Sequence, residues 1–150
     1  KKFKNIDIDN TISSYGIKLH RHNPEIEQEL NKVSKKKINF TFAPHLTPMF
    51  RGILTNIYLD TKSKVNVNKI LNCLKYSYRN SHFISIFKNK LLSTSQVINT
   101  NKCFISVCET NDKNKIIILS TIDNLIKGGA GQAVQNFNIL YNLKINEGLS

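Results

Sequence analysis

The chain has 150 residues, of which 22 are Lys or Arg and 10 are Asp or Glu, so its formal net charge is +12 at pH 7. A chain of this length buries roughly 70% of its unfolded surface, enough for one domain, or part of a larger one, to fold without disulfide bonds. With 40% hydrophobic residues and no apolar run near the roughly 18 residues of a transmembrane helix, the composition argues against collagen-like, coiled-coil, disordered and membrane-spanning classes.

One helix and two strands are predicted in the first 60 residues. Asn-Pro-Glu at 23–25 indicates a helix start, because Asn can cap, Pro lacks a backbone N–H and Glu suits the positive end of a helix. Apolar residues then recur at positions 26, 30 and 33, which predicts about three turns. The alternation over 38–42 predicts a half-buried strand that ends at Ala43-Pro44, and 53–59 predicts a second strand.

Strand patterns dominate the rest of the chain, with one helical stripe over 67–78 before them and a closing helix over 123–143 after them. That last helix places Ala130, Val134, Phe137 and Tyr141 on one face. Strands in series with grouped helices predict an α+β fold, in which a mixed, largely antiparallel sheet has helices on one face. The four predicted strands of this half are 83–87, 95–99, 103–109 and 115–122.

The excess of basic residues resembles at first a nucleic-acid or anionic-membrane footprint. Lys (19), Asn (20) and Ile (20) make up 59 of the 150 residues, whereas Arg occurs three times. Those three residue types have AT-rich codons, and interfaces that read phosphates usually prefer guanidinium groups. We therefore expect neither a nucleic-acid nor a membrane partner.

The three cysteines are odd in number and show no CxxC spacing, which argues against a disulfide framework and a structural zinc site. We expect no metal, a reducing compartment, and small buried hydrophobic roles for Cys73, Cys103 and Cys108.

His20-Arg21-His22 stands directly before the first predicted helix. In an extended tripeptide the two histidines would point to one side and Arg21 to the other. A helix amino end attracts anions, and histidine is the commonest general acid or base, so His20 and His22 are candidate catalysts for a phosphorylated substrate. The alternative is a pair of surface histidines with a capping role.

Two further stretches are candidate ligand contacts. Arg51 is one of three arginines, and it follows a segment with two prolines and precedes a glycine. An arginine kept in a lysine-rich chain indicates equally a bidentate anion contact or a structural salt bridge. The small residues of 127–133 open a helix, but they match neither the Rossmann fingerprint nor the P-loop. They could let backbone approach a ligand, or could let a helix pack closely on a neighbour.

Four stretches are spread in order over nearly the whole chain: HRHNPEIEQEL at 20–30, FAPHLTPMFRGILT at 42–55, DNLIKGGAGQAVQNFN at 123–138 and Gly-Leu at 148–149. Taken together, they resemble the N-acetyl-gamma-glutamyl-phosphate reductase family, whose order they follow. The HRHxPEI form at 20–26 differs from the pattern of the aspartate-semialdehyde dehydrogenases, the nearest relatives by chemistry.

The resemblance implies that residues 1–150 form the substrate and dimerisation domain, of the glyceraldehyde-3-phosphate-dehydrogenase-like carboxyl-terminal type. It implies a homo-oligomer, dimer or tetramer, with a subunit interface through the sheet. Family members begin with a Rossmann-type NADP-binding domain and carry a nucleophilic Cys in a P-G-C-[YF]-x-T motif; neither is present here, and no cysteine of this chain inherits the role. The helix over 123–143 would return toward that missing domain.

The implied reaction belongs to arginine biosynthesis: NADPH-dependent reduction of N-acetyl-glutamyl 5-phosphate to N-acetyl-glutamate 5-semialdehyde and phosphate, through a cysteine thioester. His20 or His22 would be the acid/base, and the motif does not choose between them. Arg21 and Arg51 would hold the phosphate or the substrate carboxylate. The residues that would approach the NADP cofactor are Asn124, Lys127, Gly128 and Gly129.

The resemblance also implies that this chain alone is inactive and that the enzyme is cytoplasmic, with a plastid location as the other option. The chain departs from the family at 98–101, where a basic or glycine residue commonly precedes the Thr/Ser-Asn pair, and at 141–143, where Gly-Leu is usual. Two alternatives stay open: a catalytically inactive truncated relic that still dimerises or binds, and, third, a basic nucleic-acid-binding module.

Overall fold

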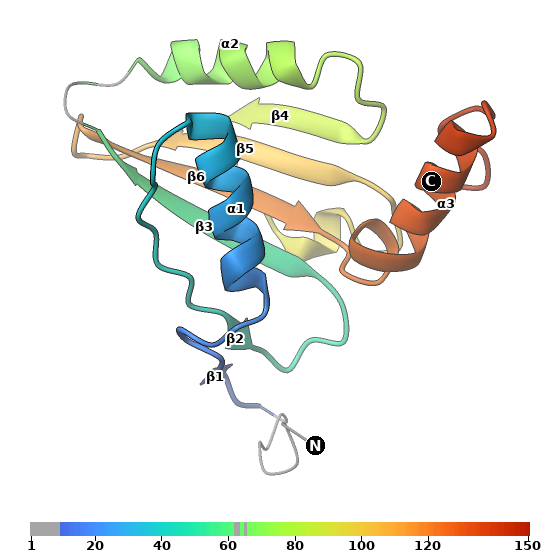
Figure 1. The fold of residues 1–150 in the computed structure, drawn as a ribbon, viewed down its shortest axis with the longest axis horizontal. Coiled ribbons are helices and arrows are strands. Elements are labelled where there is room, and N and C mark those ends of the chain that lie inside the picture. The colour runs from blue at the N-terminus through green and yellow to red at the C-terminus, as the bar shows by residue number, and fades with distance from the viewer. Residues whose placement is uncertain (1–9, 62–63, 65) are drawn as a thin grey trace. The chain divides into compact units, whose positions relative to one another are not determined.

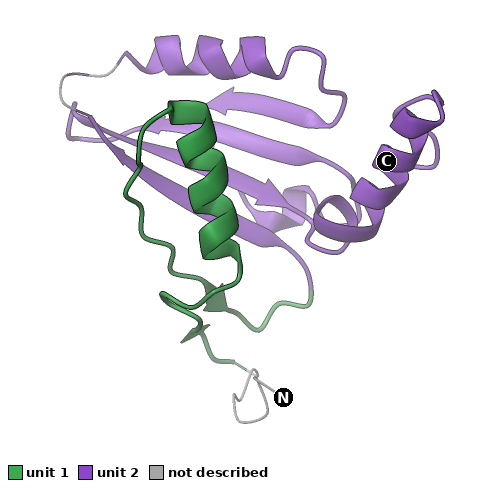
Figure 2. Cartoon of the chain, viewed as in Figure 1, with its two compact units in different colours: residues 1–50 green, residues 51–150 purple. Residues whose placement is uncertain are grey.

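A computed structural model describes residues 10–61, 64 and 66–150 (Figure 1). The chain divides into two compact units, residues 1–50 and 51–150 (Figure 2). Among the described residues, no helix has the length and apolar character that a membrane crossing requires, and no cluster of His, Cys, Asp and Glu could hold a metal ion.

In residues 10–50, the described part of the first unit, there are one long helix and a two-stranded ladder. Strand β1 (Ser13–Ser14) pairs antiparallel with β2 (His45–Leu46), and helix α1 spans His22–Ser34. The predicted cap at Asn23 is wrong, because the N-cap is Arg21, which forms no side-chain cap hydrogen bond. The helix begins two residues earlier than predicted, since the His20 ring itself accepts the first free N–H.

The predicted strand over 38–42 is also wrong, because residues 37–44 form no ladder. The backbone N–H of Ile38 donates to the side chain of Asn31 in α1 (2.8 Å) and so bonds to the helix. The alternation of apolar residues reflects contacts such as that of Phe42 with the His20 ring, whose centroids lie 5.2 Å apart.

The second unit is built on a four-stranded sheet of order β3-β6-β5-β4. All pairs are antiparallel except β4–β5, which is parallel. This confirms the predicted α+β fold with a mixed, largely antiparallel sheet, and each strand matches a predicted one. The bounds are β3 Ile53–Asp60, β4 Ile84–Lys88, β5 Cys103–Glu109 and β6 Lys115–Ile122.

Helix α2 (Val67–Ser77) covers one face of this sheet, as predicted for that stripe. Its amino end is capped by Asn66, whose side chain accepts the N–H of Lys69 (3.2 Å). Burying the apolar side chains between helix and sheet stabilises the unit by roughly 25 cal/mol for each Å² removed from water. The buried core is formed by Val67, Leu71, Val107 and Ile116.

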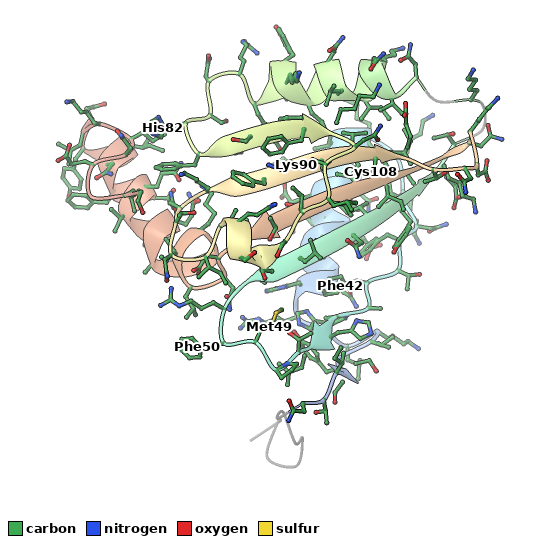
Figure 3. The ribbon with its side chains drawn as sticks, turned by 180° about the vertical axis from the view of Figure 1, so that it is seen from behind. Phe42, Met49, Phe50, His82, Lys90 and Cys108 are labelled. Carbon is green, nitrogen blue, oxygen red and sulfur yellow. The ribbon has the colours of Figure 1, made fainter. Side chains whose placement is uncertain are left out.

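The opposite face of the sheet carries the side chains that alternate with this core. Lys90 lies over it, with its Nζ 4.0 Å from the centroid of the Phe87 ring (Figure 3). On the edge strand β3, Tyr58 belongs to this face and is 71% exposed. This face therefore offers apolar surface that no described residue fully covers.

The predicted strand over 95–99 is instead a short 3-10 helix, η1 (Thr94–Gln96). A capping box closes it, because the Ser93 hydroxyl accepts the N–H of Ser95 and the Gln96 side chain accepts the N–H of Ser93. The apolar signal has another origin: Val97 is fully buried.

The predicted closing helix over 123–143 divides into a π-helical turn, η2 (Ile126–Ala130), and helix α3 (Gly131–Leu140). Gly129 has non-helical angles, φ −152° and ψ −112°, and interrupts the element. The predicted apolar face exists but is exposed, since Phe137 and Tyr141 are 53% and 61% accessible.

Two smaller expectations also change. Cys73 is exposed, so the prediction of a buried role is wrong there, whereas Cys103 and Cys108 are half-buried. The departure from the family pattern before Thr100 has a backbone reason: Asn99 adopts φ 64°, a conformation that glycine takes freely and that asparagine tolerates better than most residues.

Candidate functional site

The structure brings the two candidate catalytic histidines side by side in the first unit. Their ring centroids are 4.7 Å apart with an interplanar angle of 69°. The tripeptide is not extended, because Arg21 has helical angles, φ −57° and ψ −27°. The rings meet because His20 precedes the helix while His22 is its first residue.

One hydrogen bond indicates which ring nitrogen of neutral His20 carries the proton. The backbone N–H of His22 donates to its Nδ1 (3.2 Å). A nitrogen that accepts a hydrogen bond carries a lone pair, so neutral His20 holds its proton on Nε2. Nε2 is therefore the nitrogen through which a general acid or base at this position would act.

Aromatic rings hold His20 in place. Tyr15 lies 5.3 Å from it, centroid to centroid, and Phe42 lies 5.2 Å from it, both edge to face. Phe42 also lines a cleft of about 410 Å³ within this unit, together with Lys18, Asn23 and Glu27. The Oδ1 atom of Asn23 is buried there without a hydrogen-bond partner.

The arginines occupy different settings. Arg21 is exposed beside the histidines. Arg51, in the second unit, pairs with the fully buried Asp123, with 3.2 Å between Nη1 and Oδ2. This contact is the structural salt bridge that the sequence left open, and the Arg51 side chain remains 30% exposed. The next residue in each segment forms a second contact, since the Gly52 N–H donates to Oδ1 of Asn124 (2.7 Å).

Asp123 joins three segments of the second unit. Its Oδ2 accepts the N–H of Asn99 (2.9 Å), and its Oδ1 accepts those of Leu125 (2.8 Å) and Ile126 (3.0 Å). Burial alone would raise the pKa of this carboxyl, but these backbone donors and the Arg51 guanidinium outweigh it, so the pKa lies below its usual value. The carboxylate is therefore the ionised centre of this region.

The predicted cofactor contacts Lys127, Gly128 and Gly129 lie in or beside the turn η2. Lys127 is half-buried and donates from Nζ to Oε1 of Gln135 (2.7 Å). Burial lowers the pKa of its ammonium group, and the Coulombic attraction that the ionised form of the nearby Cys103 would exert partly offsets that effect. Gly128 and Gly129 are both exposed.

Gly131 is the glycine at which the backbone packs closely against its neighbours, and no sequence pattern singled it out. A Cβ atom there would lie 2.6 Å from Oδ1 of Asn101 and 2.6 Å from Cγ2 of Ile126. At Gly128 the nearest atom would be 3.4 Å away. Close packing therefore requires a glycine at position 131, whereas Gly128 has space beside its backbone.

We predict that Gly131→Ala destabilises the chain by about 1–3 kcal/mol, because overpacking forces Asn101 or Ile126 to move. Urea denaturation followed by circular dichroism measures the change. Gly128→Ala is the matched control, expected to change the free energy of unfolding by less than about 0.5 kcal/mol. Equal effects at the two glycines would contradict the packing argument.

Comparisons with known proteins place this geometry in a family. The family model for the semialdehyde dehydrogenase dimerisation domain matches residues 1–124. The chain belongs to the semialdehyde dehydrogenase dimerisation-domain family. Solved semialdehyde dehydrogenases share the fold: aspartate semialdehyde dehydrogenase from Francisella tularensis covers 81% of this chain, and the chain covers 35% of it, with a TM-score of 0.60 and 18% identity.

Curated relatives of this dimerisation domain are more similar in sequence. N-acetyl-gamma-glutamyl-phosphate reductase from Thermoanaerobacter pseudethanolicus is 40% identical over 92% of the chain, and the protein of that name from Ehrlichia chaffeensis is 43% identical over 89%. The chain spans about 40% of the length of these relatives.

Within this dimerisation domain, the candidate residues fall into two groups. His20, Arg21 and His22 lie in the first unit, whereas the other candidates lie in the second. Sequence reasoning did not identify three residues that contact the candidates. Asp123 pairs with Arg51, Gln135 accepts from Lys127, and Asn101 donates to Gln135. Two signals were available: the acidic residue at a strand end before a helix, and the asparagine of the Thr-Asn pair.

Proposed function

We propose that this chain is the substrate and dimerisation part of an NADPH-dependent reductase of arginine biosynthesis. The reaction converts N-acetyl-glutamyl 5-phosphate to N-acetyl-glutamate 5-semialdehyde and phosphate. The observation that carries this proposal is the 40% identity to N-acetyl-gamma-glutamyl-phosphate reductase over 92% of the chain, supported by the paired histidines.

In this proposal a cysteine thiolate from the rest of the longer protein attacks the acyl phosphate, the carbon–oxygen bond to phosphate breaks, and phosphate leaves. His20 or His22 takes the proton of the thiol and later protonates the oxyanion that develops at the thioester carbonyl, a proton that is given up again when the carbon–sulfur bond breaks and the semialdehyde forms. Arg21 and Arg51 bind the phosphate or the substrate carboxylate, with Arg51 oriented by Asp123 (3.2 Å).

NADPH supplies the hydride that reduces the thioester when it is bound. The residues of the turn η2 fit an anionic, flat group. Gly128 and Gly129 are exposed and leave backbone accessible, and Lys127 forms no ion pair with any residue that the structure describes. Asn124 is half-buried, and its Oδ1 is already bonded to Gly52, which leaves its Nδ2 as the donor for the cofactor.

The family implies self-association, and we place the subunit interface on the sheet face that carries Tyr58. Tyr58 and Leu54 on strand β3 are 71% and 45% exposed there. The exposed apolar face of α3 is assigned instead to contact with the nucleotide-binding part of the longer protein. We place the enzyme in the cytoplasm, with a plastid as the other option.

We predict a dimer for the chain in sedimentation at micromolar concentration, and a monomer for Tyr58→Asp, because a buried unpaired carboxylate at the interface is costly. The matched control is Tyr76→Asp on helix α2, where the side chain is similarly accessible (68%). A monomeric parent chain, or dissociation by both variants, would contradict the assigned face.

Growth complementation tests the function. Joined to the nucleotide-binding part of a relative, the chain is expected to restore arginine-independent growth to a bacterium that lacks this reductase. The chain alone is expected neither to restore growth nor to oxidise NADPH. Failure of the joined protein to restore growth, although it accumulates as folded protein, would favour the inactive relic.

A further inference from the structure

The contacts that the structure describes for the Lys127 side chain are with neutral groups. Its Nζ donates to Oε1 of Gln135 (2.7 Å) and lies 5.4 Å from the centroid of the Phe83 ring. The nearby Cys103 thiol is neutral, since burial raises its pKa although Ser120 and Lys127 lower it. A half-buried ammonium with these neighbours needs a fixed polar acceptor to hold its position.

Gln135 itself is fixed by a second donor. The Nδ2 atom of Asn101, which is fully buried, donates to the same Oε1 oxygen (3.0 Å). Asn101 is held in turn through its own backbone N–H, which donates to the carbonyl oxygen of Ser150. One carbonyl oxygen on helix α3 therefore accepts from the turn η2 and from the segment before strand β5.

Close packing of helix α3 against Asn101 makes this arrangement possible. Gly131 lets the first turn of the helix approach the Asn101 side chain, since a Cβ atom would lie 2.6 Å from its Oδ1. Gln135 stands four residues later and so lies on the same face of the helix, one turn further along.

From this geometry we infer that Gln135, backed by the buried Asn101, is the positioning residue of Lys127. Gln135 orients the Lys127 ammonium group and the turn η2 toward an anionic group of the bound nucleotide. The second part of this inference rests on the proposed function, whereas the first concerns this chain alone. Gln135 acts through Lys127 and is not itself a catalytic residue.

The pKa of Lys127, followed by NMR in the 150-residue chain, tests the positioning. Gln135→Glu is expected to raise it by about 1 or more, because it places a carboxylate within reach of the ammonium. Gln132→Glu is the matched control on the same helix, since Gln132 bonds instead to Asn136 (2.9 Å) on the exposed side. Equal responses to the two substitutions would overturn the inference.

A second variant removes the acceptor. Gln135→Leu is expected to shift the side-chain amide signals of Asn101 and the εCH₂ signals of Lys127, whereas Gln132→Leu leaves both in place. The backbone amide of Asn99, which donates to Asp123, reports whether the fold is retained. Unchanged Lys127 and Asn101 signals in a folded Gln135→Leu chain would overturn the inference.

The nucleotide step has its own measurement in the protein joined to a nucleotide-binding part. Gln135→Leu is expected to raise the KM for NADPH about tenfold with little change in kcat, the size of one hydrogen bond to a charged group. If Lys127→Ala leaves this KM unchanged while the NMR responses hold, the proposed cofactor contact fails and the positioning by Gln135 stands.

Discussion

Replacing the acid/base histidine by alanine is expected to lower kcat/KM about 100-fold or more in the protein joined to a nucleotide-binding part. His20→Ala and His22→Ala are both needed, because the rings lie 4.7 Å apart and the backbone N–H of His22 donates to His20. The histidine that transfers the proton shows the large loss in kcat. The other, which only orients its neighbour, loses about tenfold or less.

His45→Ala supplies the control, since His45 lies in the same unit and is exposed on strand β2. It is expected to leave kcat/KM within about twofold, because its side chain is exposed on a two-residue surface strand. Losses below tenfold for both His20→Ala and His22→Ala would remove these residues from the chemistry and leave the capping interpretation.

Removing the Asp123 carboxylate is expected to destabilise the second unit by about 3 kcal/mol, because three backbone donors and the Arg51 guanidinium lose their acceptor. Urea denaturation of Asp123→Ala measures the loss. Asp60→Ala is the control: its ion pair with Lys115 is exposed and contributes at most about 1 kcal/mol.

The contribution of Asp123 also depends on pH in a defined direction. Its pKa is lowered in the folded chain, so the unfolded chain binds the proton more tightly. The stabilisation is complete above the ordinary value of 3.8 and declines as pH falls through the lower folded value. Asp123→Asn is expected to flatten this acid limb of the stability curve. An unchanged limb would show that other carboxylates cause the decline.

Apolar patterns in the second unit predicted the structure well. Strands β5 and β6 and helix α2 contribute buried residues, and their apolar runs or stripes were sufficient to predict them. Strand β3 was predicted as well, although all of it except Leu59 is exposed. The strand predicted over 95–99 failed because Ser93 and Gln96 close a local capping box, and Val97 is buried without belonging to a strand.

The candidate site was predictable only where the residues are neighbours in sequence. His20 and His22 come together through a local turn, which a tripeptide motif can indicate. The pair formed by Arg51 and Asp123 joins positions 72 apart, and the link from Asn101 to Gln135 joins positions 34 apart. The periodicity of apolar residues in the sequence does not predict such contacts, because they arise only when the sheet has formed and brings these loops together.

The most direct test of the central claim is the rate of NADPH formation by this chain joined to the nucleotide-binding part of the Thermoanaerobacter pseudethanolicus relative. The substrates are N-acetyl-glutamate 5-semialdehyde, NADP and inorganic phosphate. The account predicts turnover that requires phosphate and that falls with His20→Ala or His22→Ala. A folded protein that binds NADPH but shows no phosphate-dependent turnover would contradict it and identify the chain as an inactive relic.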